Sequence, residues 1–153
     1  MPFMSRKPGF TLIELLIVIA LIAVLAGAVI IALNPARQFS LARNSERWSH
    51  VSALAGAITQ KTAENRGVWA CDALAVSSTV MMTSTVGAGN YDICGCLVPN
   101  SVASLPFDPS AAGAGYTSCT TYDTGYSITK NSDGRVTIAA PGAELGVTIN
   151  VTQ

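Results

Sequence analysis

Charged side chains are scarce in this chain, at 12% of its 153 residues, and one long stretch has none. The nineteen residues from Leu15 to Leu33 carry no charged or strongly polar side chain. An apolar run of that length suits the interior of a lipid bilayer. The sequence therefore predicts a membrane-spanning helix near its N-terminus.

Histidine and clustered charges are also scarce, and this argues against several functions. His50 is the only histidine, and no acid or cysteine stands at ligand spacing from it. Because there is no nucleophile elbow and no carboxylate cluster, a membrane-anchored hydrolase finds little support. Nine basic residues balance nine acids without a Lys/Arg cluster, so nothing marks a nucleic-acid interface. We expect no catalytic residue and assign His50 no role.

A compact motif precedes the apolar run. A basic segment with Arg6 and Lys7 ends at Gly9, Phe10 follows, and Glu14 is the only acid at the start of the run. A carboxylate in a spanning segment costs about 2.5–3.5 kcal/mol on insertion scales. Since something must offset that cost, Glu14 is a candidate functional residue.

This arrangement resembles the class III signal of type IV pilins and of the related type II secretion pseudopilins. Their motif is a basic leader that ends in Gly, followed by Phe-Thr-Leu-x-Glu and a long apolar run, and residues 9–14 match it at every position. The resemblance implies that a prepilin peptidase cuts after Gly9 on the cytoplasmic side and N-methylates Phe10. The apolar run would stay as the N-terminal helix of the mature subunit.

The resemblance also implies a role for Glu14 and a set of partners. In the family, this carboxylate is thought to pair with the Phe10 ammonium of a neighbouring subunit and so to fix axial register during assembly. The implied partners are further copies of the chain in a homopolymeric filament, the prepilin peptidase, the inner-membrane assembly platform and, before assembly, membrane lipid. The implied location is the bacterial inner membrane, as a single-pass protein with its N-terminus inside, and then an extracellular pilus.

Two other interpretations of the N-terminus compete with this one. Ala26-Gly27-Ala28 could be the cleavage site of an ordinary secretory signal, but apolar residues follow it at once and Glu14 does not suit that class. A plain one-span anchor is compatible with the apolar run. The flanking charges do not exclude such an anchor, because Arg37, Arg43 and Arg47 lie beyond the run. The pilin interpretation rests on the motif.

Four segments are predicted along the chain. They are a cleaved leader (1–9), a transmembrane or filament-core helix (10–33), an amphipathic stalk helix (34–66) and a globular β head (67–153). Asn34-Pro35 should kink or break the helix, because proline lacks a backbone donor. The stalk has an apolar stripe at helical spacing, formed by Leu41, Trp48, Val51, Leu54, Ala55 and Ile58, with Trp48 as a core anchor. Most basic residues of the stalk, Arg43, Arg47 and Lys61, should point elsewhere, as should His50.

The head shows strand signals near its end. Residues 126–130, 135–140 and 146–151 alternate apolar and polar side chains, and 131–134 form a hairpin loop. A further strand is expected at 91–98, with 67–90 as a linker. The predicted fold class is α+β: a long N-terminal helix packed on a small antiparallel sheet of three to four strands, the pilin fold that the resemblance implies. Residues 105–109 also resemble the Leu-Pro-x-Asp-Pro segment of major pseudopilins and many pilins.

All four cysteines, Cys71, Cys94, Cys96 and Cys119, lie beyond the apolar run. An even number of cysteines after an export signal predicts two disulfides, although the sequence leaves three pairings open. A bond between Cys94 and Cys96 would be the most strained. A zinc site is less well supported, because a single residue separates Cys94 from Cys96 and there is no second close pair.

The C-terminal region bears on the choice between the two related classes. Major pseudopilins carry an acid-rich calcium loop there, whereas this chain offers only Asp133 and Glu144. We therefore expect no calcium site and no cofactor. The expected function is that of a structural subunit of an extracellular type IV pilus-like filament, not an enzyme. The alternative is a pseudopilin of a type II secretion system.

Overall fold

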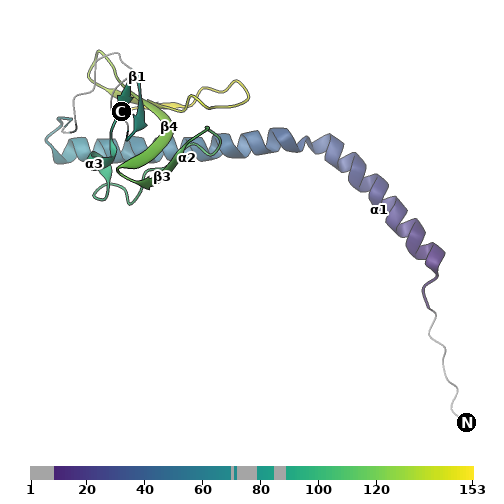
Figure 1. Ribbon diagram of the computed structural model, residues 1–153. Helices are drawn as coiled ribbons and strands as arrows, with labels where there is room; N and C mark the ends of the chain where they lie inside the picture. The colour runs from purple at the N-terminus through teal and green to yellow at the C-terminus, as the bar shows by residue number, and fades with distance from the viewer. Residues whose placement is uncertain (1–8, 70, 72–78, 85–88) are drawn as a thin grey trace, which may run out of the picture. The chain divides into compact units, whose positions relative to one another are not determined.

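Figure 1 shows the computed structural model of the chain, which describes residues 9–69, 71, 79–84 and 89–153. The chain divides into two compact units, Met1–Gln38 and Phe39–Gln153. Most of the expected leader lies outside the described residues, as do residues 70, 72–78 and 85–88 of the expected linker.

Helix α1 (Leu12–Leu33) forms from the apolar run. Among the described residues, it is the one helix that is long and apolar enough to cross a membrane. Its 22 residues span about 33 Å at 1.5 Å per residue, close to the thickness of a bilayer's hydrocarbon core. The helix ends at Asn34, whose backbone is left-handed with φ of 43°. The interruption expected at Asn34-Pro35 is thus confirmed.

Helix α2 (Pro35–Glu64) buries most of the expected stripe but departs from it near its N-terminal end. Val51, Leu54, Ala55 and Ile58 are buried as predicted, but Trp48 is 42% exposed and Leu41 is 40% exposed. Arg47 is completely buried in their place. The expectation was wrong for Leu41, Trp48 and Arg47 because it ranked positions by hydrophobicity. Arg47 lies four residues before Val51 on the buried face, and its charge finds a partner in the core.

The sheet contains the four antiparallel neighbours β1 (Thr79–Thr83), β4 (Thr121–Lys130), β5 (Val136–Ala139) and β6 (Asn150–Thr152), in that order. Two short strands extend it: β2 (Asn90–Tyr91) runs parallel to β1, and β3 (Gly115–Ser118) pairs with β4. The α+β class is therefore confirmed. Strand β1 falls within the expected linker, where small and polar neighbours hid its Thr-Val pattern from sequence analysis.

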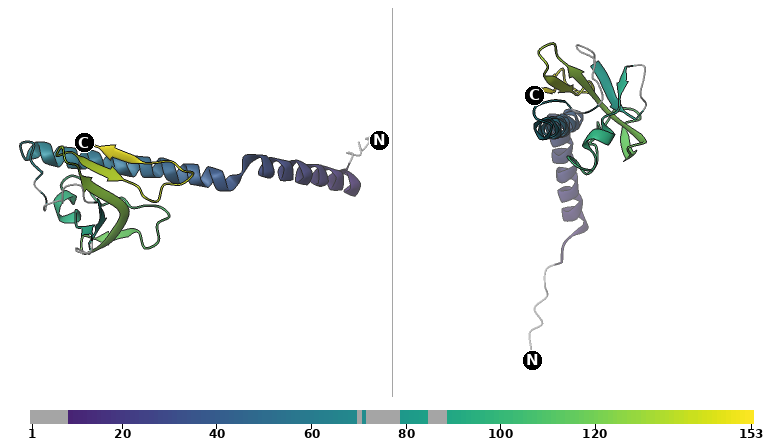
Figure 2. Two further views of the ribbon diagram at one scale, coloured as in Figure 1. Left: turned by 90° about the horizontal axis from the view of Figure 1, so that it is seen from above. Right: turned by 90° about the vertical axis from the view of Figure 1, so that its left-hand side faces the viewer.

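The core of the second unit lies between α2 and the sheet, whose strands are seen beside the helix in Figure 2. As predicted, the sheet contributes the buried side chains of Tyr126, Ile128, Val136 and Ile138, and Ile149, just before β6, is also buried. Val147 is exposed, contrary to expectation, because the last strand begins only at Asn150. The positive φ angles of Leu145 and Gly146 turn the chain before it enters that strand.

Residues 91–98 were expected to be a strand, but Cys94–Leu97 form the short helix α3. The Asp92 carboxylate accepts a hydrogen bond from the Cys94 N–H, and the Tyr122 hydroxyl accepts bonds from the Ile93 and Cys94 N–H groups. Side chains therefore satisfy the N–H groups at the start of this helix. Tyr122 lies 28 residues from Cys94, so local alternation could not reveal the helix.

Candidate processing and assembly site

The Gly9–Phe10 bond lies just outside helix α1. Gly9 and Phe10 are exposed and non-helical, and Thr11 is the N-cap residue with extended backbone angles (φ −87°, ψ 149°). The Thr11 hydroxyl accepts a hydrogen bond from the Glu14 N–H at 3.3 Å. Sequence analysis missed this role, although Thr-x-x-Glu before an apolar run is the pattern of a capping box.

Glu14 occupies the first turn of α1. It is the only charged residue of that helix, and its position near the positive end of the helix dipole favours a carboxylate. Its carboxylate forms no hydrogen bond or ion pair with the described part of the chain, and the residue is exposed. The site therefore presents an unpaired anion within a turn of the expected cleavage point.

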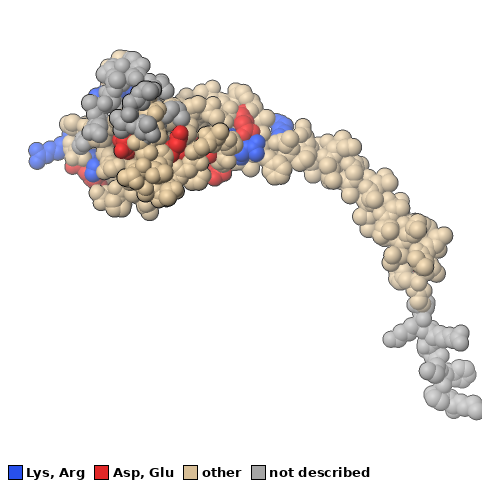
Figure 3. Space-filling view, in the orientation of Figure 1, with Lys and Arg blue, Asp and Glu red and all other residues tan. Residues whose placement is uncertain are grey.

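The rest of α1 is a continuous apolar surface. None of its residues is buried within the chain. In the face shown in Figure 3, α1 carries no charged atoms, whereas Lys, Arg, Asp and Glu gather on the unit that begins at Phe39. Water does not tolerate so large an apolar surface, so lipid or other protein must cover α1.

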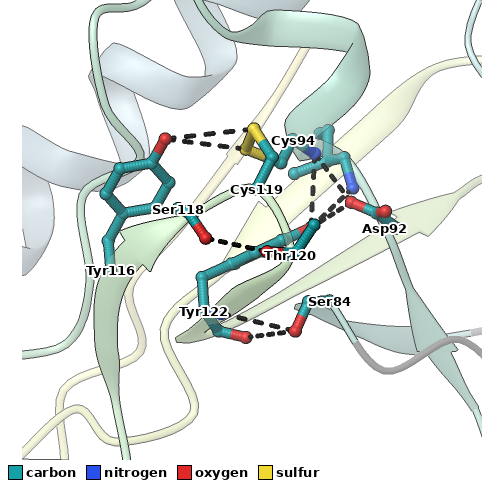
Figure 4. The surroundings of a disulfide bond; sticks show 9 residues. Ser84, Asp92, Cys94, Tyr116, Ser118, Cys119, Thr120 and Tyr122 are labelled. Carbon is teal, nitrogen blue, oxygen red and sulfur yellow. Dashed lines mark hydrogen bonds between the residues drawn. A yellow bond between two sulfur atoms is a disulfide. The ribbon is translucent and has the colours of Figure 1, made fainter.

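Two disulfides hold α3 in the second unit. Cys71 is bonded to Cys96 and Cys94 to Cys119, with Cα–Cα distances of 5.6 and 5.2 Å. This agrees with the expectation of two disulfides and selects one of the three possible pairings. Figure 4 shows the Tyr116 hydroxyl facing both sulfurs of the Cys94–Cys119 bond, 3.9 Å from each.

Tyr122 supports the same helix from β4. Its hydroxyl donates to an Asp92 oxygen at 2.5 Å and accepts the two N–H groups described above, as Figure 4 also shows. Burial and the Asp92 carboxylate both raise the pKa of Tyr122 above its ordinary value. The phenol therefore stays protonated at neutral pH and keeps its donor role.

A cluster of charges ties two loops to α2. Arg47 donates to both Asp108 oxygens, at 2.7 and 3.0 Å, and both side chains are fully buried. Arg43 donates two hydrogen bonds to the Glu144 carboxylate, at 2.6 and 2.7 Å. The Asn44 side-chain amide donates to the Glu144 carbonyl and accepts from its N–H, both at 2.9 Å. Asp108 is the acid of the Leu-Pro-x-Asp-Pro segment, so this pairing gives the segment a physical role.

These contacts lower the pKa values of both acids, Asp108 and Glu144. Burial alone would raise the pKa of Asp108, but hydrogen bonds from Arg47 and from the Ser110 and Ala111 amides bring it below its ordinary value. Hydrogen bonds, chiefly from Arg43, lower the pKa of Glu144 to about 2. Both acids are therefore charged throughout the physiological range.

His50, to which the sequence assigned no role, contacts the buried Tyr126 with its Nδ1 atom 2.8 Å from the phenol oxygen. Its Nε2 atom lies 3.9 Å from Glu46. These contacts join α2 to β4 and account for a packing role.

Comparison with known proteins bears directly on the N-terminal site. The family described as the prokaryotic N-terminal methylation motif matches residues 4–30, which include Gly9, Phe10, Glu14 and most of α1. This motif is the class III signal of type IV pilins and pseudopilins. The chain thus carries the signal of a type IV pilin-like or pseudopilin precursor. Searches of curated proteins and of solved structures found no match to the chain.

Proposed function

We propose that this protein is a structural subunit of a type IV pilus-like filament. A prepilin peptidase removes the leader 1–9 and N-methylates Phe10, and the subunit then polymerises through α1. The carrying observation is that the methylation motif includes most of a 22-residue helix that has no buried residue.

The exposed surface of α1 supports both stages of this scheme. Before assembly, the helix spans the inner membrane, where all its backbone groups except those at the ends are satisfied internally. In the extracellular filament, the same surface is covered by α1 helices of other copies. The segments after it, a stalk over 34–66 and a β head over 67–153, remain outside the hydrocarbon core of the membrane.

Glu14 gives the assembly its register. Cleavage creates an ammonium at Phe10, and a neighbouring subunit's Glu14 is a suitable partner because its carboxylate is unpaired in the described chain. An ion pair gains much more in a low-dielectric filament core than in water, provided that both charges are satisfied. A misaligned subunit would bury the carboxylate without its partner.

The alternative is a pseudopilin of a type II secretion system. The C-terminal loop favours the pilus subunit, since Arg43 and Arg47 contact Glu144 there in a region where major pseudopilins place a calcium loop. An arginine clamp needs no metal to hold the loop. Filaments displayed on intact cells support the pilus subunit, whereas a requirement in protein secretion supports the pseudopilin.

Two substitutions separate the processing step from assembly. Gly9→Phe should block cleavage and leave the precursor in the membrane. Glu14→Ala should leave cleavage largely intact but reduce filament yield, with Glu14→Asp as a matched control that keeps the charge. Immunoblots of membrane and sheared fractions measure both steps. Normal filament yield from Glu14→Ala would contradict the register role, and cleavage of Gly9→Phe at the normal rate would contradict the processing site.

A further inference from the structure

The three arginines that follow the apolar run differ in one respect. Arg43 is paired with Glu144, and Arg47 is paired with Asp108. Arg37 is exposed, and within the described residues its guanidinium has no ion pair and no hydrogen bond. Of the three, Arg37 alone keeps its full donor capacity for a partner outside the chain.

The end of α1 fixes where this arginine lies. A helix leaves its last four carbonyls without intrahelical donors, and Pro35 has no N–H to offer. Unsatisfied carbonyls are not tolerated in hydrocarbon. The Asn34 junction must therefore lie where polar groups are available, which in a membrane is the boundary with the headgroups.

Arg37 lies three residues beyond that junction in the first turn of α2, where its N–H donates to the Asn34 carbonyl at 3.0 Å. Three helical residues advance about 5 Å, and one headgroup layer is about 5–7 Å thick. The guanidinium thus reaches the level of the lipid phosphates, for which its planar fork is suited. Two residues further along the chain, Phe39 is 64% exposed and offers a position for a fluorescent reporter of depth.

We propose that Arg37 binds phospholipid phosphate and docks the segment 34–37 in the headgroup layer of the leaflet where α1 ends. This role rests on the proposed function, in which α1 spans the inner membrane before assembly. It places a second contact with lipid at the end of α1 opposite the leader. The bound partner is a lipid headgroup, and a carboxylate of a second copy is the competing occupant.

The test uses the full chain in nanodiscs that hold one copy each, made with phosphatidylglycerol and with lipids brominated near the top or near the middle of the acyl chains. Phe39→Trp reports the depth of the junction, and Ile22→Trp reports the middle of α1. The unsubstituted chain gives the baseline quenching of the two native tryptophans, Trp48 and Trp69. Shallow bromines should quench Phe39→Trp at least about twofold more than deep ones, and Ile22→Trp should show the reverse order.

Arg37 is then varied in the Phe39→Trp background. Arg37→Gln should lower the shallow quenching by about half, whereas Arg37→Lys should keep most of it, since either basic side chain is attracted to an anionic surface. Shallow quenching that is unchanged by Arg37→Gln would overturn the lipid assignment. Shallow quenching that is seen only in discs prepared with two copies would also overturn it. Loss of the deep quenching of Ile22→Trp would instead contradict the premise that α1 spans the membrane before assembly.

Discussion

The side chain of Arg47 shows how a single residue can connect separate parts of this fold. Besides Asp108, it donates to Asn44 at 2.9 Å and to Ser110 at 2.6 Å. Such a buried pair adds little over a well-packed apolar alternative, because both charges lose their hydration. Removing one partner is costly, however, since the other charge stays buried alone. Arg47 is therefore needed once Asp108 is in the core.

We expect Arg47→Met to cost about 3–5 kcal/mol of folding stability, the usual range for breaking a buried pair from one side. The neighbouring Trp48→Ala is the control. Because Trp48 is 42% exposed, this change should cost less than the roughly 3–5 kcal/mol typical of an emptied aromatic core site. Urea unfolding of both variants measures the difference. A larger loss for Trp48→Ala than for Arg47→Met would contradict the observed burial.

The same cluster predicts how stability depends on pH. Asp108 and Glu144 have lowered pKa values in the folded chain, so the folded state keeps these charges at a pH where the unfolded state takes up protons. Their contribution is complete above about pH 5 and is lost as the pH falls towards 2. The urea midpoint should therefore be flat from pH 7 to about 5 and fall below it.

Glu144→Gln should lower the midpoint at pH 7 and flatten its decline at acid pH. The matched control is Asp133→Asn, which removes an exposed acid whose partner, Arg135, is also exposed. Exposed pairs contribute little, so this control should leave the midpoint at pH 7 nearly unchanged. An acid decline that is the same with and without Glu144 would show that other groups cause it.

At the scale of elements, helix α3 is too short to be stable alone and is held in place by two disulfide bonds. Four residues cannot form a stable helix alone, because nucleation is costly. Each of the two disulfides that meet there closes a loop with a sequence separation of 25. Loop closure of that size contributes about 3 kcal/mol per bond in the chain-entropy account.

Peptide mapping without reductant should recover the pairs Cys71–Cys96 and Cys94–Cys119 from exported protein. Replacing Cys71 and Cys96 together by serine should lower stability by about 2–4 kcal/mol without exposing a free thiol. The control is the unsubstituted protein after reduction, which should lose more stability because both of its disulfides open. Recovery of a Cys94–Cys96 peptide would contradict the structure of this region.

The elements that sequence analysis found are those with a long, regular pattern. The apolar run predicted α1, and alternation predicted the C-terminal half of β4 and, to within one residue at each end, β5. Helix α3 and the burial of Arg47 were missed because both depend on distant partners, Tyr122 and Asp108. The motif at residues 9–14 was informative since its chemistry is local: a cleavage point, an N-terminus and one acid lie within six residues.

At the scale of the whole molecule, two kinds of apolar surface require different partners. The buried side chains of α2 are covered by the sheet and α3 of the same chain. The side chains of α1 are not covered by the part of the chain that the structure describes. Folding is thus complete within the second unit, whereas α1 depends on lipid or on further subunits.

A chain that starts at Ala36 should therefore be soluble and folded without detergent, while the full chain requires detergent. The reason is that truncation removes the surface of α1 and keeps the core, including Val51, Leu54 and Ile58. Sedimentation and circular dichroism measure solubility and folding, with the detergent-solubilised full chain as the control. A fragment that aggregates as readily as the full chain would show that the core does not suffice.

The central claim is that the chain is processed at Gly9–Phe10 and assembled through α1, and the intact mass of sheared surface filaments tests it most directly. The account predicts a filament subunit that begins with N-methylated Phe10, comprises residues 10–153 and contains two disulfides. A subunit that retains Met1, one that begins at Val29 after the Ala26-Gly27-Ala28 segment, or the absence of this chain from the filaments would contradict it.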